Sequence, residues 1–271
     1  MTTRDNQQIA SVLLSKATEL GADLVGFADV EELKQSPSFT FAPKMTGAGE
    51  GTGTRKNKLG LKPGEVLWPE KAKTVMAIAV HHPQDKPEMD WWFGKVDPPG
   101  NRVLAKVIRE LCTWINNEFD FNGVHLAYHI EKGGTYLKDA AVLAGLGCIG
   151  KNNILVTPKY GPRVRLRALT LDINLPSSGP LAFDPCLQCD DLCRKACPQK
   201  AYSIEQYTAK AYDQDILPGR DGFFARPACN QQMDKNIEKA KEHIVEGIDK
   251  PVKIIKYCRI CELSCPVGKT I

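Results

Sequence analysis

The 271-residue sequence lacks a long hydrophobic run, an apolar signal segment and a marked excess of either charge. Its longest apolar stretch, TVMAIAV at residues 74–80, is far shorter than the roughly 18 residues that a membrane-spanning helix needs. The N-terminus, MTTRDNQQIA, has no apolar core and no twin arginine, so no secretion signal is expected. The balance of 36 basic against 32 acidic residues argues against a nucleic-acid-binding protein. We therefore expect a cytoplasmic protein that does not bind a membrane and whose composition does not indicate a nucleic acid as its partner.

Cysteine, in contrast, is abundant and unevenly distributed. Eight of the ten cysteines lie between Cys186 and Cys265, whereas Cys112 and Cys148 stand alone upstream. In a reducing cytoplasm these thiols are expected to bind metals or clusters rather than to form disulfides. The change in composition indicates two domains, which we place at residues 1–180 and 181–271.

The first of these domains is expected to alternate between helix and strand. Apolar periodicity predicts an N-terminal helix that Gly21 ends, and short apolar runs predict strands. A glycine- and lysine-rich stretch at residues 46–63 is expected to be a loop. The other expected elements are an amphipathic helix containing residues 103–115, a helix at 135–143, and strands at 24–28, 75–80, 124–130 and 154–156.

Periodicity also places individual side chains. Cys112 falls on the apolar face of the amphipathic helix, which predicts a core residue rather than a ligand. Arg163, Arg165 and Arg167 alternate with apolar residues, which predicts a half-buried strand with three guanidinium groups on one side. Such a row is typical of a solvated sheet face, and the alternative is a face turned toward an anionic cofactor or partner.

The segment GLGCIGKN at residues 145–152 nearly matches a phosphate-binding loop. Asn152 stands where that loop needs a hydroxyl for magnesium, and a helix rather than a strand is expected before the segment. We therefore expect no nucleotide hydrolysis.

The eight clustered cysteines form two runs and one single residue. The runs are Cys-x2-Cys-x3-Cys-x3-Cys-Pro, from Cys186 to Cys197, and Cys-x2-Cys-x3-Cys-Pro, from Cys258 to Cys265. In two-cluster ferredoxins the last cysteine of such a run ligates the other cluster. This crossover predicts one [4Fe–4S] cluster held by Cys186, Cys189, Cys193 and Cys265. The second is then expected to be held by Cys197, Cys258, Cys261 and the single remaining Cys229.

The alternative is a pair of structural zinc sites, because Cys-x2-Cys knuckles also bind zinc. Zinc knuckles require neither the terminal Cys-Pro nor interlocked runs, so the pattern favours the two clusters. A brown protein with about eight iron atoms per chain is expected from the clusters, and a colourless zinc protein from the alternative.

Other segments resemble a known family. KDAAVLAGLGCIGKNNILV at residues 138–156, followed by YGPRVRL at 160–166, resembles the AGLGWIGKN segment of epoxyqueuosine reductases, distant relatives of the corrinoid reductive dehalogenases. ELGADLVGFA at residues 19–28 and WPEKAKTVMAIAV at 68–80 are similar to that family's first strands. The cysteine pattern, with a lone cysteine between two runs, is similar as well, and the resemblance covers most of the chain.

This resemblance implies an α+β fold, in which a nitroreductase-related α/β domain that binds cobalamin precedes a ferredoxin-like domain with two [4Fe–4S] clusters. Cobalamin would bind base-off in a cleft between the domains and receive electrons from the clusters. The cofactor-binding residues that the resemblance implies are Gly147, Cys148, Lys151, Asn152 and Thr157.

The resemblance also implies catalytic candidates. Counted back from AGLG without gaps, the family's proton-donating aspartate falls on Glu131, expected at the end of an apolar strand where desolvation would raise its pKa. The alternative for Glu131 is a surface pair with Lys132, and His129 on the same strand is a second proton-donor candidate. The family's tryptophan after AGLG is Cys148 here, either a spacer or a functional thiol.

The expected function is a low-potential reduction that uses cobalamin and an external electron donor, with a small molecule or a protein-bound corrinoid as substrate. One alternative is an electron-transfer protein that reduces a partner corrinoid or redox protein. The other is a short epoxyqueuosine reductase whose arginine row contacts tRNA. Family members that act on tRNA continue into a helical-repeat tail, whereas this sequence stops at Ile271. The resemblance therefore implies weaker binding of RNA.

Overall fold

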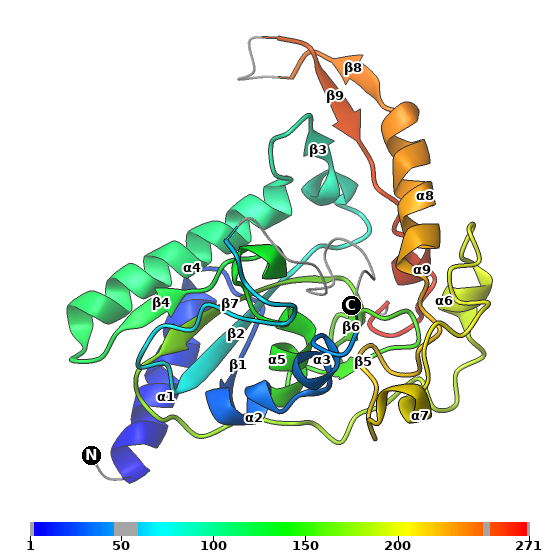
Figure 1. Ribbon diagram of the computed structural model, residues 1–271. Helices are drawn as coiled ribbons and strands as arrows, with labels where there is room; N and C mark the ends of the chain where they lie inside the picture. The colour runs from blue at the N-terminus through cyan, green and yellow to red at the C-terminus, as the bar shows by residue number, and fades with distance from the viewer. Residues whose placement is uncertain (1–2, 46–58, 246–249, 270–271) are drawn as a thin grey trace.

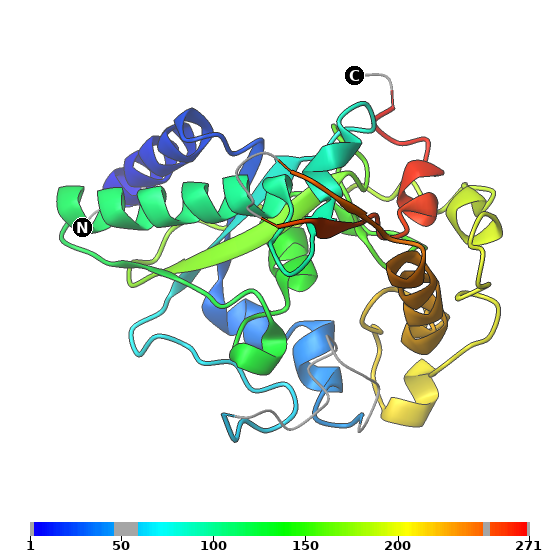
Figure 2. The same ribbon diagram turned by 90° about the horizontal axis from the view of Figure 1, so that it is seen from above.

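The computed structural model describes residues 3–45, 59–245 and 250–269. At its centre is a four-stranded antiparallel sheet in the order β1-β2-β7-β4, with helices on both faces (Figure 1 and Figure 2). The strands are β1 (Leu24–Asp29), β2 (Thr74–His81), β7 (Val164–Leu171) and β4 (Gly123–His125). The architecture is therefore a mixed α/β fold, in which an antiparallel sheet is buried between helical layers.

The helices α1 (Thr3–Glu19) and α4 (Pro99–Glu118) lie side by side on one face of the sheet (Figure 2). Alternate residues of β2 point to this face, where Met76 and Ile78 are fully buried in the same core as Cys112. The period of two along the strand and of 3.6 along the helices brings these apolar side chains together. The predicted core position of Cys112 is confirmed.

The opposite face is covered by α2 (Val30–Lys34), α3 (Pro37–Phe41) and α5 (Leu137–Leu143). Alanines on β1, β2 and α5 contribute much of this core, and their small side chains let α5 approach the sheet closely. After α5 the chain forms a short hairpin of β5 (Cys148–Ile149) and β6 (Leu155–Val156). The residues between these two strands become part of the candidate site.

The last third of the chain has little regular structure and lies beside one end of the sheet (Figure 1). Its helices are α6 (Leu192–Lys195), α7 (Ala209–Tyr212), α8 (Arg226–Glu238) and α9 (Ile260–Leu263). A second sheet, in the order β3-β9-β8, joins β8 (Lys241–His243) and β9 (Val252–Ile255) to β3 (Trp92–Phe93), which follows the one-turn helix η1 (Pro87–Asp90). The two parts of the chain thus share a sheet, and the division at residue 180 stays a prediction.

Most predicted elements are confirmed, but the strand at residues 124–130 is wrong beyond His125. The chain there leaves the sheet and forms the one-turn helix η2 (Ile130–Lys132), which Gly133 ends with a φ of +79°. A left-handed backbone of this kind favours glycine and reverses the chain, so Glu131 and His129 do not lie on a strand. The prediction that Val103 lies on the buried apolar face of α4 is also wrong, because Val103 is 42% exposed. Of the predicted loop at 46–63, residues 46–58 lie outside the described residues.

No helix in the described ranges is both long and apolar enough to cross a bilayer.

Candidate functional site

One group of four thiols, from both cysteine runs, surrounds a cavity of about 290 Å³. Three of them are less than a tenth exposed, and Cys189 is half-buried. Burial, together with the nearby Cys265 and Cys186, raises the pKa of the Cys193 thiol to about 11. The structure therefore brings together the first predicted set: Cys186, Cys189, Cys193 and Cys265.

Cys265 reaches this cavity from the second run because two loops pack tightly beside it. A Cβ atom at Gly161, whose φ is +56°, would lie 2.0 Å from the carbonyl oxygen of Val267, so this approach requires glycine. The buried Arg163 donates a hydrogen bond of 2.6 Å from Nη2 to the same carbonyl. The resembling segment YGPRVRL thus fixes the position of the crossover cysteine.

A second group of thiols forms where α8 and the loop before α9 meet the end of the first run. Burial, with smaller contributions from Cys229 and Cys258, raises the pKa of the Cys261 thiol to about 12. The pKa of Cys229 is likewise raised by burial and by Cys258 and Cys197, against an opposing effect of Arg226. These four thiols are the second predicted set: Cys197, Cys229, Cys258 and Cys261.

The chemistry of each group fits a positively charged iron centre. Neighbouring thiolates repel one another and raise each other's pKa, whereas thiolate ligands of a metal centre are deprotonated outright. In the described part of the chain, no three or more His, Cys, Asp or Glu side chains have the geometry to hold a single metal ion. The proposal of two clusters therefore rests on the two sets of four thiols, not on a preformed ion site.

The turn between β5 and β6 lies against the first group. Lys151 and Asn152 line its cavity, and Lys151 Nζ lies 2.6 Å from Asp191 Oδ1. The buried Thr157 donates its hydroxyl to the carbonyl oxygen of Gly161 at 3.1 Å. A Cβ atom at Gly147 would lie 2.1 Å from the Val156 carbonyl oxygen. Thr157 and Gly147 thus shape the hairpin itself, while Lys151 and Asn152 face the thiols.

Cys148 also lies near the first group. Burial raises the pKa of its thiol to about 11, with Asp184 and Cys186 adding to the rise. A half-buried, protonated thiol beside a thiol group is consistent with a spacer, and a role toward the cofactor stays a prediction.

The catalytic candidates lie in and beside η2, with Glu131 half-buried and His129 exposed. Glu131 raises the pKa of Tyr136, which burial raises most strongly. Among the described residues, the buried hydroxyl groups of Thr135 and Tyr136 have no hydrogen-bond partner. Buried polar atoms of this kind usually have a partner in a bound molecule or in water. The residues beside Glu131 thus fit a polar ligand, such as the side-chain amides of a corrin or a substrate.

Lys138 is a candidate that the sequence did not reveal. Burial lowers its pKa to about 8, with Arg226 lowering it and Asp139 opposing. Its ammonium group donates to the Asn153 backbone and side-chain oxygens at 2.8 Å each. A lysine that titrates close to neutral pH is suited to acid–base chemistry, but no local pattern distinguishes it from an ordinary helix lysine.

A buried cluster of ionic side chains joins the α/β part of the chain to the second cysteine run. Asp90 accepts a hydrogen bond from His82 Nδ1 at 2.8 Å and forms ion pairs with Arg165 and Arg259. Arg259, which follows Cys258, also pairs with Glu262 and donates to the His82 carbonyl at 3.0 Å. Burial opposes ionisation of Asp90, but these partners hold its pKa below its usual value. We refer to these five residues as the junction cluster.

Arg163, Arg165 and Arg167 therefore have partners within the chain. This corrects both interpretations of the sequence, the solvated sheet face and the face turned toward an anionic cofactor or partner. Arg163 binds the Val267 carbonyl and Arg165 belongs to the junction cluster. The guanidinium group of Arg167 lies 4.0 Å from the ring centre of Tyr128. The row is a set of internal contacts rather than a solvated face or a free anion-binding face.

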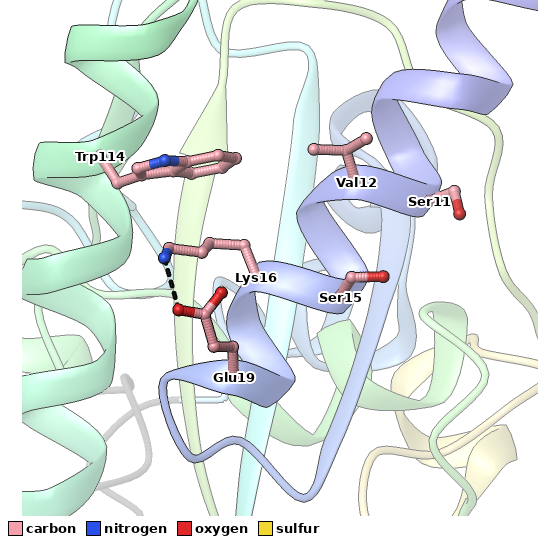
Figure 3. A pocket seen from close by; sticks show the side chains of 6 residues that line it. All are labelled: Ser11, Val12, Ser15, Lys16, Glu19 and Trp114. Atoms are coloured by element: carbon pink, nitrogen blue, oxygen red, sulfur yellow. Dashed lines mark hydrogen bonds and ion pairs between the residues drawn. The ribbon is translucent and has the colours of Figure 1, made fainter.

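A second hollow lies on α1 and α4, and none of the candidate residues lines it (Figure 3). Lys16 forms an ion pair with Glu19 at 2.8 Å and lies over the Trp114 ring at 5.6 Å. These are ordinary contacts between helices, and we assign the hollow no role.

Comparison with known proteins gives the family context. No family model matches the chain. Over 267 residues it is 25% identical to the epoxyqueuosine reductase of Lactococcus garvieae, covering 94% of this chain and 68% of that protein. The epoxyqueuosine reductase structure from Streptococcus thermophilus has a TM-score of 0.61 at 22% identity, covering 98% of this chain and 67% of that one. A reductive dehalogenase structure that suggests a mechanism for B12-dependent dehalogenation has a TM-score of 0.60 at 17% identity, covering 99% and 33%.

These similarities define the class of the chain as an oxidoreductase. Within that class the chain resembles the epoxyqueuosine reductases, and the resemblance seen in its sequence is confirmed. The chain spans about two thirds of the length of these relatives and one third of the dehalogenase.

Proposed function

We propose that the chain is a cobalamin-dependent iron–sulfur reductase of the reducing cytoplasm. The observation that carries the proposal is the arrangement of eight thiols in two groups of four, each with ligands from both ends of the cysteine-rich segment. The relatives support it, because one dehalogenase structure concerns B12-dependent chemistry and the epoxyqueuosine reductases share the fold.

In this proposal the α/β part binds cobalamin base-off and the cysteine-rich part is a ferredoxin-like domain with two [4Fe–4S] clusters. When bound, the clusters supply one-electron transfer from an external donor, and cobalamin supplies a strongly reducing cobalt centre. The chain itself would hold the clusters with its eight thiols, of which Cys186, Cys193 and Cys265 are buried and the others half-buried. Glu131 is the proposed proton donor, with His129 as the second candidate. Lys151 and Asn152, in the turn between β5 and β6, and Cys148, in β5, would approach the cofactors, and Gly147 and Thr157 shape that hairpin.

Metal analysis of the anaerobic protein tests the proposal first. Protein produced anaerobically with cobalamin is expected to be brown and to contain about eight iron and about eight sulfide per chain. A colourless protein with about two zinc atoms would instead support the structural zinc sites, and a protein with neither metal would refute both. The cobalamin spectrum, taken on the same sample, separates a corrin-binding enzyme from a plain electron carrier.

Replacing the proposed proton donor tests the reaction. Glu131→Gln is expected to reduce turnover by about 100-fold or more, because amide nitrogen cannot deliver the proton that a carboxylic acid delivers. Suitable probes are an epoxyqueuosine-modified tRNA stem loop and 3-bromo-4-hydroxybenzoic acid, each seen bound to a relative.

Lys132→Gln is the matched control, because it removes the charge of the residue next to Glu131 and leaves the carboxyl group of Glu131 in place. Iron and cobalamin content are expected to be unchanged in both variants. Turnover in Glu131→Gln equal to that of the control would show that the carboxyl group is not the proton donor.

A further inference from the structure

The cavity of the first thiol group opens at the surface beside α6. Besides the four thiols, it is lined by four exposed residues: Gln188, Asp190, Leu192 and Pro266. The helix α6, which begins at Leu192, lies at the outer edge of the molecule, away from the central sheet (Figure 1 and Figure 2). A cluster held by these thiols would therefore lie close beneath exposed side chains.

Apolar side chains are exposed at this opening. Leu187, which lies between Cys186 and Gln188 in the chain, is 74% exposed, and Leu192 is 44% exposed. Pro266 is a third exposed apolar residue there. Apolar side chains that gather at one place on the surface indicate a site for another molecule. The small size of this group suits a transient electron-transfer contact, which buries less than about 1,200 Å².

Exposed lysines flank these apolar residues, and we call them the basic rim: Lys159, Lys195 and Lys269. Lys195 follows Leu192 by three residues in α6, so the two side chains are neighbours. The backbone N–H of Lys269 donates to the Pro266 carbonyl oxygen at 3.3 Å. A Cβ atom on the glycine before Lys269 would lie 2.7 Å from the Lys159 carbonyl oxygen, so these two loops are in contact.

The acidic side chains near the opening do not cancel the basic rim. Asp191 forms an ion pair with Lys151 at 2.6 Å, and Asp184 forms one with Arg220 at 2.7 Å. Asp190 is exposed at the opening. The three lysines of the rim against this one aspartate give the opening a positive charge. Such a surface attracts a negatively charged partner and increases its rate of association.

We propose that this opening is the docking surface of the external electron donor, and that the donor is a small acidic protein that carries single electrons. The inference rests on the proposed function, since it needs a cluster held by the first thiol group. In the proposed step the donor is oxidised by one electron and the cluster is reduced by one electron, and no bond forms or breaks. The apolar residues would form the centre of the contact, and the basic rim would pair with carboxylates of the donor.

Stopped-flow electron transfer with a plant-type ferredoxin, an acidic [2Fe–2S] protein, tests the inference. The second-order rate constant is measured in the direction that the two potentials favour, because both directions use the same contact. For the wild type it is expected to fall about tenfold or more between an ionic strength of about 0.01 M and about 1 M, as the Debye length shortens from about 30 Å to about 3 Å.

Two variants alter the two parts of the surface separately. Lys195→Glu combined with Lys269→Glu is expected to lower the rate constant about tenfold or more at low ionic strength, and the difference from the wild type is expected to shrink in salt. Leu187→Ala is expected to lower it at every ionic strength, because it removes apolar contact without a change of charge.

The matched control is Lys95→Glu combined with Lys241→Glu. These exposed lysines belong to the loop after β3 and to β8, and their replacement changes the net charge by the same amount. The control is expected to keep the rate constant of the wild type. An equal loss in the control, or a wild-type rate constant in Lys195→Glu with Lys269→Glu, would overturn the inference.

A small reductant and the iron content separate docking from cluster damage. Dithionite needs no docking surface, so it is expected to reduce all variants at the rate of the wild type. If Lys195→Glu with Lys269→Glu loses iron, Lys159→Glu, which lies outside both cysteine runs, gives the same test with the same expected direction. A wild-type protein without iron would refute the proposed function itself, whereas a wild type with about eight iron atoms and no effect of these variants would refute only the docking surface.

Discussion

A chain in which Cys186 and Cys265 are both replaced by alanine is expected to keep about four of its eight iron atoms. The two residues are far apart in the sequence and belong to different runs, but their thiols surround the same cavity. Each single substitution is expected to remove the same cluster, so the second substitution has no further effect. The measurement is iron and sulfide content after anaerobic purification.

The pair of Cys186 and Cys197 gives the opposite expectation. These residues belong to the same run, but Cys197 raises the pKa of Cys229 and Cys258 and so lies with the second group. Replacing both by alanine is expected to remove all of the iron. If clusters followed the runs instead, the two double variants would exchange their results, and the crossover would be wrong.

Cys112→Ala serves as the control for these variants. Its thiol is buried in the core between α1, α4 and the sheet, and burial alone raises its pKa to about 11. The iron content of this variant is expected to equal that of the wild type. Far-UV circular dichroism of each variant checks that the α/β part is folded.

The elements with a clear local period were predictable from the sequence. The N-terminal helix, the strands β1 and β2 and the apolar face of α4 follow from spacings of 3.6 and 2, which neighbouring residues determine. The grouping of the thiols was predictable as well, because a cluster constrains the spacing of its ligands. The role of these thiols as ligands stays a prediction.

The remaining features depend on contacts between distant parts of the chain. The turn at η2 departs from a strand because of two glycines, although the apolar residues before it suggested a longer strand. The arginine row had the period of a strand, but its partners, such as Asp90 and Val267, come from 75 to 104 residues away. Lys138 does not stand out in its local sequence either, because its lowered pKa comes from burial.

Asp90→Asn is expected to be the most destabilising substitution outside the thiol groups. The carboxylate of Asp90 is 7% exposed and binds His82, Arg165 and Arg259. Its neutralisation therefore removes the buried negative charge that compensates two half-buried guanidinium groups. Breaking a buried ion pair in this way costs about 3–5 kcal/mol, which lowers the melting temperature of a chain of this size by roughly 6–20 °C. Differential scanning fluorimetry of the anaerobic protein at pH 7 measures the effect.

The pH is chosen from the direction of the pKa shift. Because the pKa of Asp90 is held below its usual value, the stabilisation by its ion pairs is complete above about pH 4 and is lost as the pH falls through the folded-state pKa. Neutral pH therefore reports the full effect of the substitution.

The control is Glu31→Gln, which breaks an exposed ion pair with Lys34 at 2.6 Å and is expected to cost less than about 1 kcal/mol. Since Arg259 lies between two thiols of the second group, Asp90→Asn is also expected to loosen the attachment of the cysteine-rich part and to speed loss of iron to a chelator. A melting temperature and a chelation rate equal to those of Glu31→Gln would show that the junction cluster does not hold the two parts of the chain together.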